Sequence, residues 1–147
     1  MLHPAPTNAI DPALARGIVK EIAEPTATKP ARVRLAFHNL NYLMDLVPSG
    51  PIDAAVGKGI IGVISADARR VDRVTTGGRY VEPVIGRPRR VQGTVIAIDE
   101  ATGSIVVNAG VPIKCHLTDG RQTPSGFELG EFVSFDVLRG ATFQTQR

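Results

Sequence analysis

The chain contains few of the residues that form covalent cross-links or large aromatic cores. Its 147 residues include one cysteine, no tryptophan, two tyrosines and five phenylalanines. The single cysteine, Cys115, cannot form an internal disulfide, which excludes the disulfide-rich folds of small secreted proteins. We therefore expect a cytoplasmic protein that is held together by noncovalent packing.

Long apolar runs and targeting signals are also missing. No stretch approaches the roughly 20 consecutive apolar residues that cross a bilayer as a helix. Residues 1–6 have neither the basic start nor the apolar stretch of a secretory signal. With 43% hydrophobic and 21% charged residues, the composition is that of an ordinary globular protein. These features predict a protein without a membrane partner.

The usual signatures of catalysis and of bound metals are absent as well. His116 follows Cys115, but neighbouring residues on a strand point to opposite faces, and no second cysteine or histidine stands at a metal-ligand spacing. The sequence has no supported Ser-His-Asp or Cys-His order, no glycine-rich phosphate loop and no P-loop lysine. We expect a protein that is not an enzyme and that uses neither a cofactor nor a metal ion.

The chain is rich in glycine, proline and alternating apolar residues. Fifteen glycines and eleven prolines indicate short strands joined by tight turns. Alternation of polar and apolar residues predicts strands at 32–37, 42–47, 58–66, 90–99, 104–109, 111–117 and 131–138. Residues 12–23 fit two structures, because Asp11 and Pro12 are a good helix start whereas Gly17 favours a strand. We prefer the strand, which makes the fold class all-β.

The two halves of the chain follow a similar pattern, which indicates a duplicated β module. Gly17 and Gly93 each begin an alternating apolar strand, and each half closes on a glycine, a charge and an apolar run. We expect two tandem small β-barrels joined by an arginine-rich hairpin that turns at Gly77 and Gly78. The expected boundaries are a disordered tail at 1–15, an N-terminal barrel at 16–75, a basic hairpin or linker at 76–91 and a C-terminal barrel at 92–147. Whether the halves form separate barrels or share one core stays open.

Two short segments resemble known small barrels. Residues 129–137 resemble the closing strand of cold-shock-type OB barrels, and Gly93-Thr94-Val95 resembles their opening strand. Residues 93–99 and 105–107 also resemble the KOW-containing, SH3-like barrels of ribosomal and transcription factors. Both resemblances imply a small β-barrel, and they imply RNA binding only by fold analogy. Residues 104–108 contain no aromatic side chain, so the stacking surface of cold-shock proteins is not expected here.

The positive charge of the chain is concentrated in one segment. Residues 69–90 carry a net charge of +5, whereas the rest of the chain carries −2. The basic residues of this segment are all arginines: Arg69, Arg70, Arg73, Arg79, Arg87, Arg89 and Arg90. A guanidinium can donate two parallel hydrogen bonds to a phosphate, where an ammonium offers a point charge. We predict that these arginines contact the phosphates of a nucleic acid, with single-stranded RNA favoured over DNA.

A second interpretation of the same arginines is structural. Charged side chains that alternate with valines also keep an edge hairpin soluble and prevent pairing between edges. The alternative function is therefore a module for protein interaction or self-assembly, including a homodimer. A third, weaker possibility is a small-ligand barrel with a pocket lined by Tyr42 or Tyr80. Salt-sensitive binding to a polyanion favours the nucleic-acid hypothesis, and a dimer on a sizing column favours self-assembly.

Overall fold

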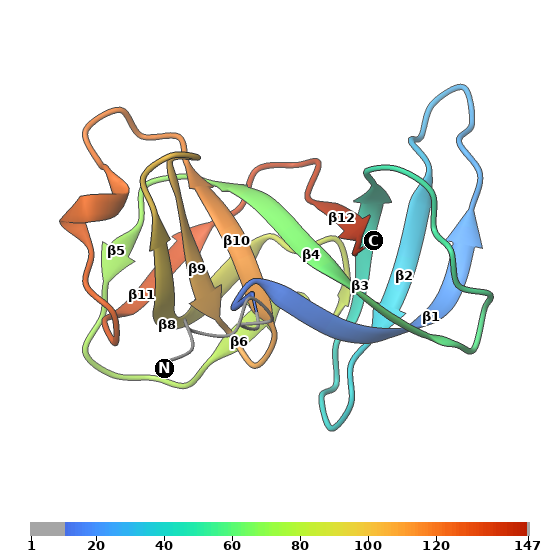
Figure 1. The fold of residues 1–147 in the computed structure, drawn as a ribbon, viewed down its shortest axis with the longest axis horizontal. Helices are drawn as coiled ribbons and strands as arrows, with labels where there is room; N and C mark the ends of the chain where they lie inside the picture. Colours follow the sequence, from blue (N-terminus) through green and yellow to red (C-terminus); the bar gives the residue numbers. More distant parts are fainter. Residues whose placement is uncertain (1–10, 147) are drawn as a thin grey trace, which may run out of the picture.

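The structure, a computed structural model, describes residues 11–146 (Figure 1). It contains one short 3-10 turn at Pro124–Gly126 and no α-helix within that range. The strands are β1 (Leu14–Ala23), β2 (Arg32–Ala36), β3 (Leu43–Pro48), β4 (Gly59–Ala68), β5 (Asp72–Arg73), β6 (Tyr80–Glu82), β7 (Ile85–Gly86), β8 (Arg90–Asp99), β9 (Ser104–Asn108), β10 (Pro112–Leu117), β11 (Phe132–Asp136) and β12 (Thr142–Thr145). The expected all-β fold class is confirmed.

Most of residues 12–23 form strand β1, as preferred from the sequence, and not a helix. The Asp11 carboxylate accepts a hydrogen bond from the Ala13 N–H at 2.9 Å, in a turn that leads into the strand. Side chains then alternate between buried and exposed from Ala15 to Lys20, which is the period of a strand. Because β1 begins at Leu14, the strand starts within the segment expected as a tail. Residues 1–10 of that tail lie outside the described residues.

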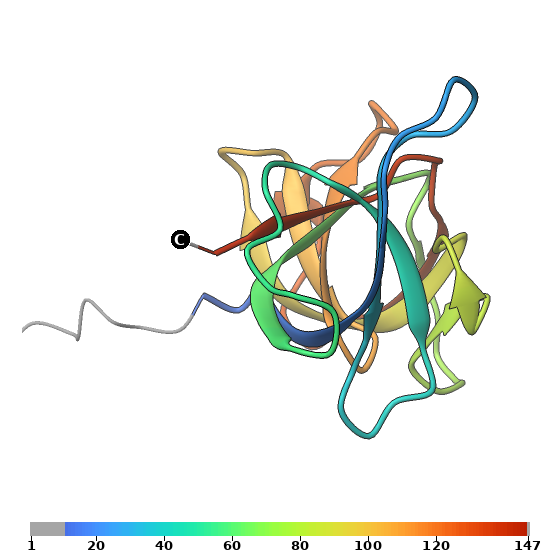
Figure 2. The same cartoon turned by 90° about the vertical axis from the view of Figure 1, so that its right-hand side faces the viewer.

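The first four strands and the last one close into a five-stranded barrel, which Figure 2 shows from its end. β1 pairs with β2, and β2 pairs with β3, as antiparallel neighbours. β12 fits between β3, to which it is parallel, and β4, to which it is antiparallel. Pairing of β1 with β4 completes the ring. The C-terminal strand therefore closes a barrel that the N-terminal strands begin.

A second ring of strands uses the far end of β4. β8 pairs with both β9 and β11, and β9 pairs with β10. The end of β10 runs parallel to Ser65–Ala68 of β4. A bridge between Ala68 and Val137, just beyond β11, returns the ring to β4. Figure 1 shows β4 crossing from one ring to the other, so this strand belongs to both.

This strand pairing crosses the boundaries that the sequence pattern predicts. β4 lies in the expected N-terminal barrel but pairs with β10, and β12 lies in the expected C-terminal barrel but pairs with β3 and β4. The rings thus have one strand in common, and the chain returns to its first barrel at its C-terminal end. The division of the chain into two modules stays a prediction.

The expected arginine-rich hairpin is wrong. The strands of this segment, β5, β6 and β7, do not pair with one another but with β11, β8 and β3. Gly77, with a φ of +108°, turns the chain between β5 and β6. Tyr42 holds β6 in its place. Its hydroxyl accepts a hydrogen bond from the Val81 N–H at 2.9 Å and donates one to Ala109 O at 3.2 Å. The segment is therefore bonded to both rings instead of forming a free ribbon.

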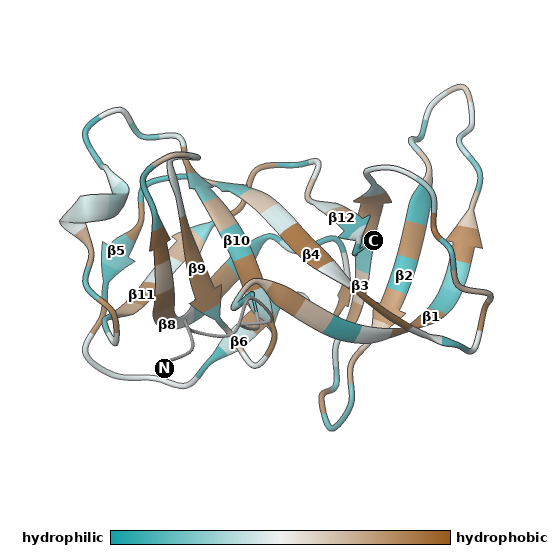
Figure 3. Ribbon diagram, in the orientation of Figure 1, coloured by the Kyte–Doolittle hydropathy of each residue, from teal (hydrophilic) through white to brown (hydrophobic). Residues whose placement is uncertain are grey.

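One continuous hydrophobic cluster fills the two rings. Hydrophobic and hydrophilic residues alternate along β1 and β2, which directs one set of side chains into the barrel (Figure 3). Phe143 of β12 stands opposite Ile64 of β4, and both side chains are fully buried. The backbones of β4 and β12 approach closely beside these side chains. A Cβ atom built on Gly62 would lie only 2.2 Å from Gln144 O. This contact joins the C-terminal strand to the shared strand.

Candidate nucleic-acid interface

The seven arginines predicted as phosphate contacts fall into two groups that differ in their partners. Three form ion pairs with acidic side chains: Arg70, Arg73 and Arg90. Four have no acidic partner among residues 11–146: Arg69, Arg79, Arg87 and Arg89. An arginine that is already paired must lose that pair, or share it, before it binds phosphate. The unpaired arginines are therefore the better candidates for the site.

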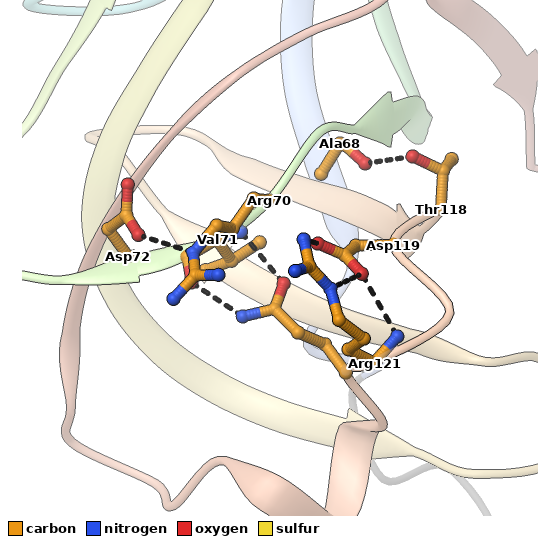
Figure 4. Close-up of polar contacts among 8 residues, drawn as sticks. Ala68, Arg70, Val71, Asp72, Thr118, Asp119 and Arg121 are labelled. Atoms are coloured by element: carbon orange, nitrogen blue, oxygen red, sulfur yellow. Dashed lines mark hydrogen bonds and ion pairs between the residues drawn. The ribbon is translucent and has the colours of Figure 1, made fainter.

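Arg70, just beyond β4, lies near Arg121 of the loop of residues 118–126, which also pairs with an acidic side chain (Figure 4). Arg70 Nε lies 3.1 Å from Asp72 Oδ1, and Arg121 Nη2 lies 2.9 Å from Asp119 Oδ2. Hydrogen bonds from Arg121, together with the charge of Arg70, lower the pKa of Asp119 to about 2. Because the folded-state pKa is depressed, the pair contributes fully at neutral pH and is lost only as the pH falls from about 4 through 2. Arg121 is therefore occupied under ordinary conditions.

Arg73 and Arg90 are held in a similar way. Arg73 pairs with Glu131, and its guanidinium lies 4.7 Å from the centroid of the Phe127 ring. Arg90 Nη1 lies 2.7 Å from Asp136 Oδ1, a bond that raises the pKa of the arginine. These contacts join β5 and β8 to β11 and the loop before it. The two arginines thus have a structural role in the second ring.

A side-chain clamp fixes the loop of residues 118–126 against the segment that follows β4. Gln122 accepts a hydrogen bond from the Val71 N–H and donates one to Val71 O, both at 2.8 Å. Thr118 donates a hydrogen bond to Ala68 O at 2.6 Å, as Figure 4 shows. Val71 is buried, so the clamp satisfies backbone groups that water reaches poorly. The position of Arg121 depends on this clamp.

Replacing Gln122 with alanine is expected to lower the free energy of unfolding by about 1–3 kcal/mol, because both Val71 backbone groups lose their partner. Urea denaturation of the purified variant measures this change. The neighbouring Thr123→Ala variant is the control, since Thr123 is exposed and its side chain shares a hydrogen bond only with the Ser125 hydroxyl in residues 11–146, at 3.2 Å. A Gln122→Ala variant as stable as the control would contradict the structural importance of the clamp.

One of the four unpaired arginines, Arg87, lines a hollow between the β1–β2 loop and the segment before β12. Its volume is about 460 Å³, within the range of small-molecule sites, roughly 300–1,000 Å³. The apolar side chains that line it are Ala23, Pro30, Ala31, Leu46, Val47 and Ala141. The charged side chains that line it are Glu24, Lys29, Arg32, Asp45, Arg87 and Arg139. We call this feature the cationic hollow.

The acidic residue Asp45 of β3 does not neutralise the cationic hollow, because it is already paired with two arginines of β2. Arg34 donates two hydrogen bonds to the Asp45 carboxylate, at 2.7 and 3.0 Å, and the pKa of Arg34 is raised as a result. Arg32 Nη1 lies 3.5 Å from the same carboxylate. One carboxylate thus faces two guanidinium groups. The remaining charged residues of the hollow are three cations and Glu24, so an excess of positive charge is left.

Arg87 and Arg139 both line the cationic hollow, and Arg89 stands two residues after Arg87. Partial desolvation lowers the pKa of Arg87, and the charges of Arg139 and Arg89 lower it further. The backbone brings these residues together, since the Val137 N–H donates a hydrogen bond to Arg89 O at 2.8 Å. No acidic partner for any of the three is found in the described part of the chain. A bound anion would relieve the repulsion among them.

Local turns hold the loops around the cationic hollow. The Lys29 N–H donates to Thr26 Oγ1 at 3.1 Å, and the Thr26 N–H donates to Lys29 O at 2.8 Å, which closes the tip of the β1–β2 loop. Gly140, with a φ of +103°, turns the chain into β12. The Val47 N–H then donates to Ala141 O at 2.9 Å. Both loops are thus anchored by backbone hydrogen bonds.

No family model, curated protein or solved structure matches this chain. The structure places Arg87 at the same hollow as Arg139 and Lys29, which the sequence analysis did not select. The only local signal at Arg139 is an Arg-Gly pair after a strand, which is typical of an ordinary turn.

Metal and thiol sites have less support in the described residues than an anion site. No group of three or more His, Cys, Asp or Glu side chains that could hold a metal ion occurs in residues 11–146. Burial raises the pKa of the Cys115 thiol, whereas the adjacent His116 is exposed. The same residues contain no helix that is long and apolar enough to cross a membrane. The charged lining of the cationic hollow gives it a preference for anions.

Proposed function

We propose that this protein binds single-stranded nucleic acid without catalysing a reaction, and that it holds phosphates at the cationic hollow. The observation that carries the proposal is that Arg87 and Arg139 line one hollow, with Arg89 next to them in the chain, and that none of the three has an acidic partner in residues 11–146. Phosphate neutralises such a group, and guanidinium groups bind it with paired hydrogen bonds. The apolar residues beside the arginines suit the sugar and base of a nucleotide. RNA is expected to bind more tightly than DNA.

We also infer that the five-stranded barrel is of the OB type. Its order, β1-β2-β3-β12-β4, with β12 parallel to β3, supports a Greek-key barrel of this kind. OB barrels bind oligonucleotides on their second and third strands and on the loops that join strands 1–2 and 4–5. The equivalent parts of this chain are β2, β3, the loop at 24–31 and the segment at 137–141. Residues from all four line the cationic hollow.

The second ring supports the proposal of a duplicated module. β8 takes the place of β1, and each of these strands pairs with the next strand and with the fourth strand of its own ring. Each also has a register shift that begins two residues after its glycine, following Val19 after Gly17 and Val95 after Gly93. In this view each half contributes the strand that closes the other half's ring.

Fluorescence anisotropy of a labelled 16-nucleotide single-stranded RNA tests the proposed function. Micromolar or tighter binding at 50 mM salt is expected to weaken about tenfold or more at 200 mM salt, because each phosphate contact releases counterions. A DNA strand of the same base order gives the preference between the two nucleic acids. Absence of RNA binding at 50 mM salt would reject the proposal.

The second candidate function is self-assembly, and exposed apolar side chains on β1 favour it. Ile18 and Ile22 are 36% and 41% exposed, and Val56, in the loop before β4, is 59% exposed. A sizing column run at several protein concentrations, without nucleic acid, measures association directly. A dimer that persists on dilution would support this function, and a monomer at every concentration would reject it.

A further inference from the structure

A second, smaller hollow adjoins the cationic hollow and differs from it in charge. It has a volume of about 250 Å³ and lies where β4 meets β10, with Asp67, Lys114 and His116 among its lining residues. Gly140 lines both hollows, so the two meet at the turn before β12. Gly140 itself places no side chain between them, and a Cβ atom built there would have no neighbour within 4 Å. We call the second feature the neutral hollow.

The charges of the neutral hollow make it a poor site for phosphate. Lys114 is already engaged, since its Nζ lies 3.6 Å from Asp99 Oδ2. Asp67 adds a carboxylate that repels anions, and its side chain is 58% exposed. The one ion-pairing side chain within 4 Å of Asp67 among residues 11–146 is the His116 imidazole, whose Nδ1 lies 3.6 Å from Asp67 Oδ1, longer than a good hydrogen bond. The Asp67 oxygens therefore keep acceptor capacity for a ligand.

We propose that the neutral hollow reads a base of the nucleic acid whose phosphate occupies the cationic hollow, and that Asp67 selects bases carrying an exocyclic amino group. This inference rests on the proposed function. Carboxylates accept hydrogen bonds from the amino group of cytosine, and the amino group of adenine offers the same donor. Uracil offers a single ring N–H between two carbonyl oxygens, which the carboxylate repels. The exposed imidazole of His116 provides a ring against which the base stacks.

Labelled eight-nucleotide strands of oligo(C), oligo(A) and oligo(U) RNA test this specificity by fluorescence anisotropy at 50 mM salt. The wild-type protein is expected to bind oligo(C) and oligo(A) at least about fivefold more tightly than oligo(U), the lower end of what one base contact contributes. In Asp67→Ala the three affinities are expected to become equal, with oligo(U) bound as tightly as before or more tightly.

Glu24→Ala is the matched control, because it removes one exposed carboxylate that lines the cationic hollow. It is expected to raise all three affinities together and to leave their ratios unchanged. Equal wild-type affinities for the three strands, or a preference that survives in Asp67→Ala, would overturn the specificity while leaving the proposed function intact. A wild-type protein that binds none of the strands would reject both.

Discussion

Replacing Arg87, Arg89 and Arg139 together with alanine is expected to weaken binding of a 16-nucleotide single-stranded RNA at least tenfold at 50 mM salt. These arginines have no acidic partner in residues 11–146 and repel one another, so their charge is free to meet phosphate. The slope of log affinity against log salt is expected to become shallower by about 2, since each lost contact with a single strand removes roughly 0.7 from it. Anisotropy titrations between 50 and 200 mM salt measure both quantities.

The control for this variant removes the same charge from another face. Arg16, Lys20 and Lys58 are exposed on β1 and just before β4, and none of them lines the cationic hollow. Their triple alanine variant is expected to bind RNA within about threefold of the wild type, because it alters only the screened, long-range field. If the two triple variants lose affinity equally, binding depends on net charge alone and the hollow is not the site.

Replacing Gly62 with alanine is expected to lower the free energy of unfolding by about 3 kcal/mol. The added Cβ would lie 2.2 Å from Gln144 O and 2.6 Å from the Phe143 ring, so β12 must move away from β4. Overpacking of this kind costs about 1–3 kcal/mol or more, and a backbone atom cannot rotate aside as a side chain does. Urea denaturation followed by circular dichroism measures the loss.

Gly59 provides the matched control in the same strand. A Cβ atom at Gly59 would lie 3.8 Å from its nearest neighbour, Gly17 O, which is ordinary contact. Gly59→Ala is therefore expected to leave the free energy of unfolding within about 0.5 kcal/mol of the wild type. Equal stability of the two variants would mean that β12 does not pack tightly on β4 and that the barrel is not closed there.

Only part of the candidate site could be found from the sequence. The density of arginines at residues 69–90 directed attention to Arg87 and Arg89, which the structure places at the cationic hollow or beside it. The same density also selected Arg70, Arg73 and Arg90, whose charges are taken by acids at other positions. A charge count cannot separate these groups, because an ion pair such as that between Arg73 and Glu131 joins residues far apart in the chain.

Alternation of polar and apolar residues was enough to predict most strands and the all-β class, because it is a local pattern with the period of a strand. The arrangement of those strands depended on contacts between distant segments. Nothing local shows that β12 returns to β3, that β4 serves two rings, or that Arg139 meets Arg87. Backbone pairing is the same for almost any side chain, so the partners of a strand follow from how the whole chain buries its apolar residues.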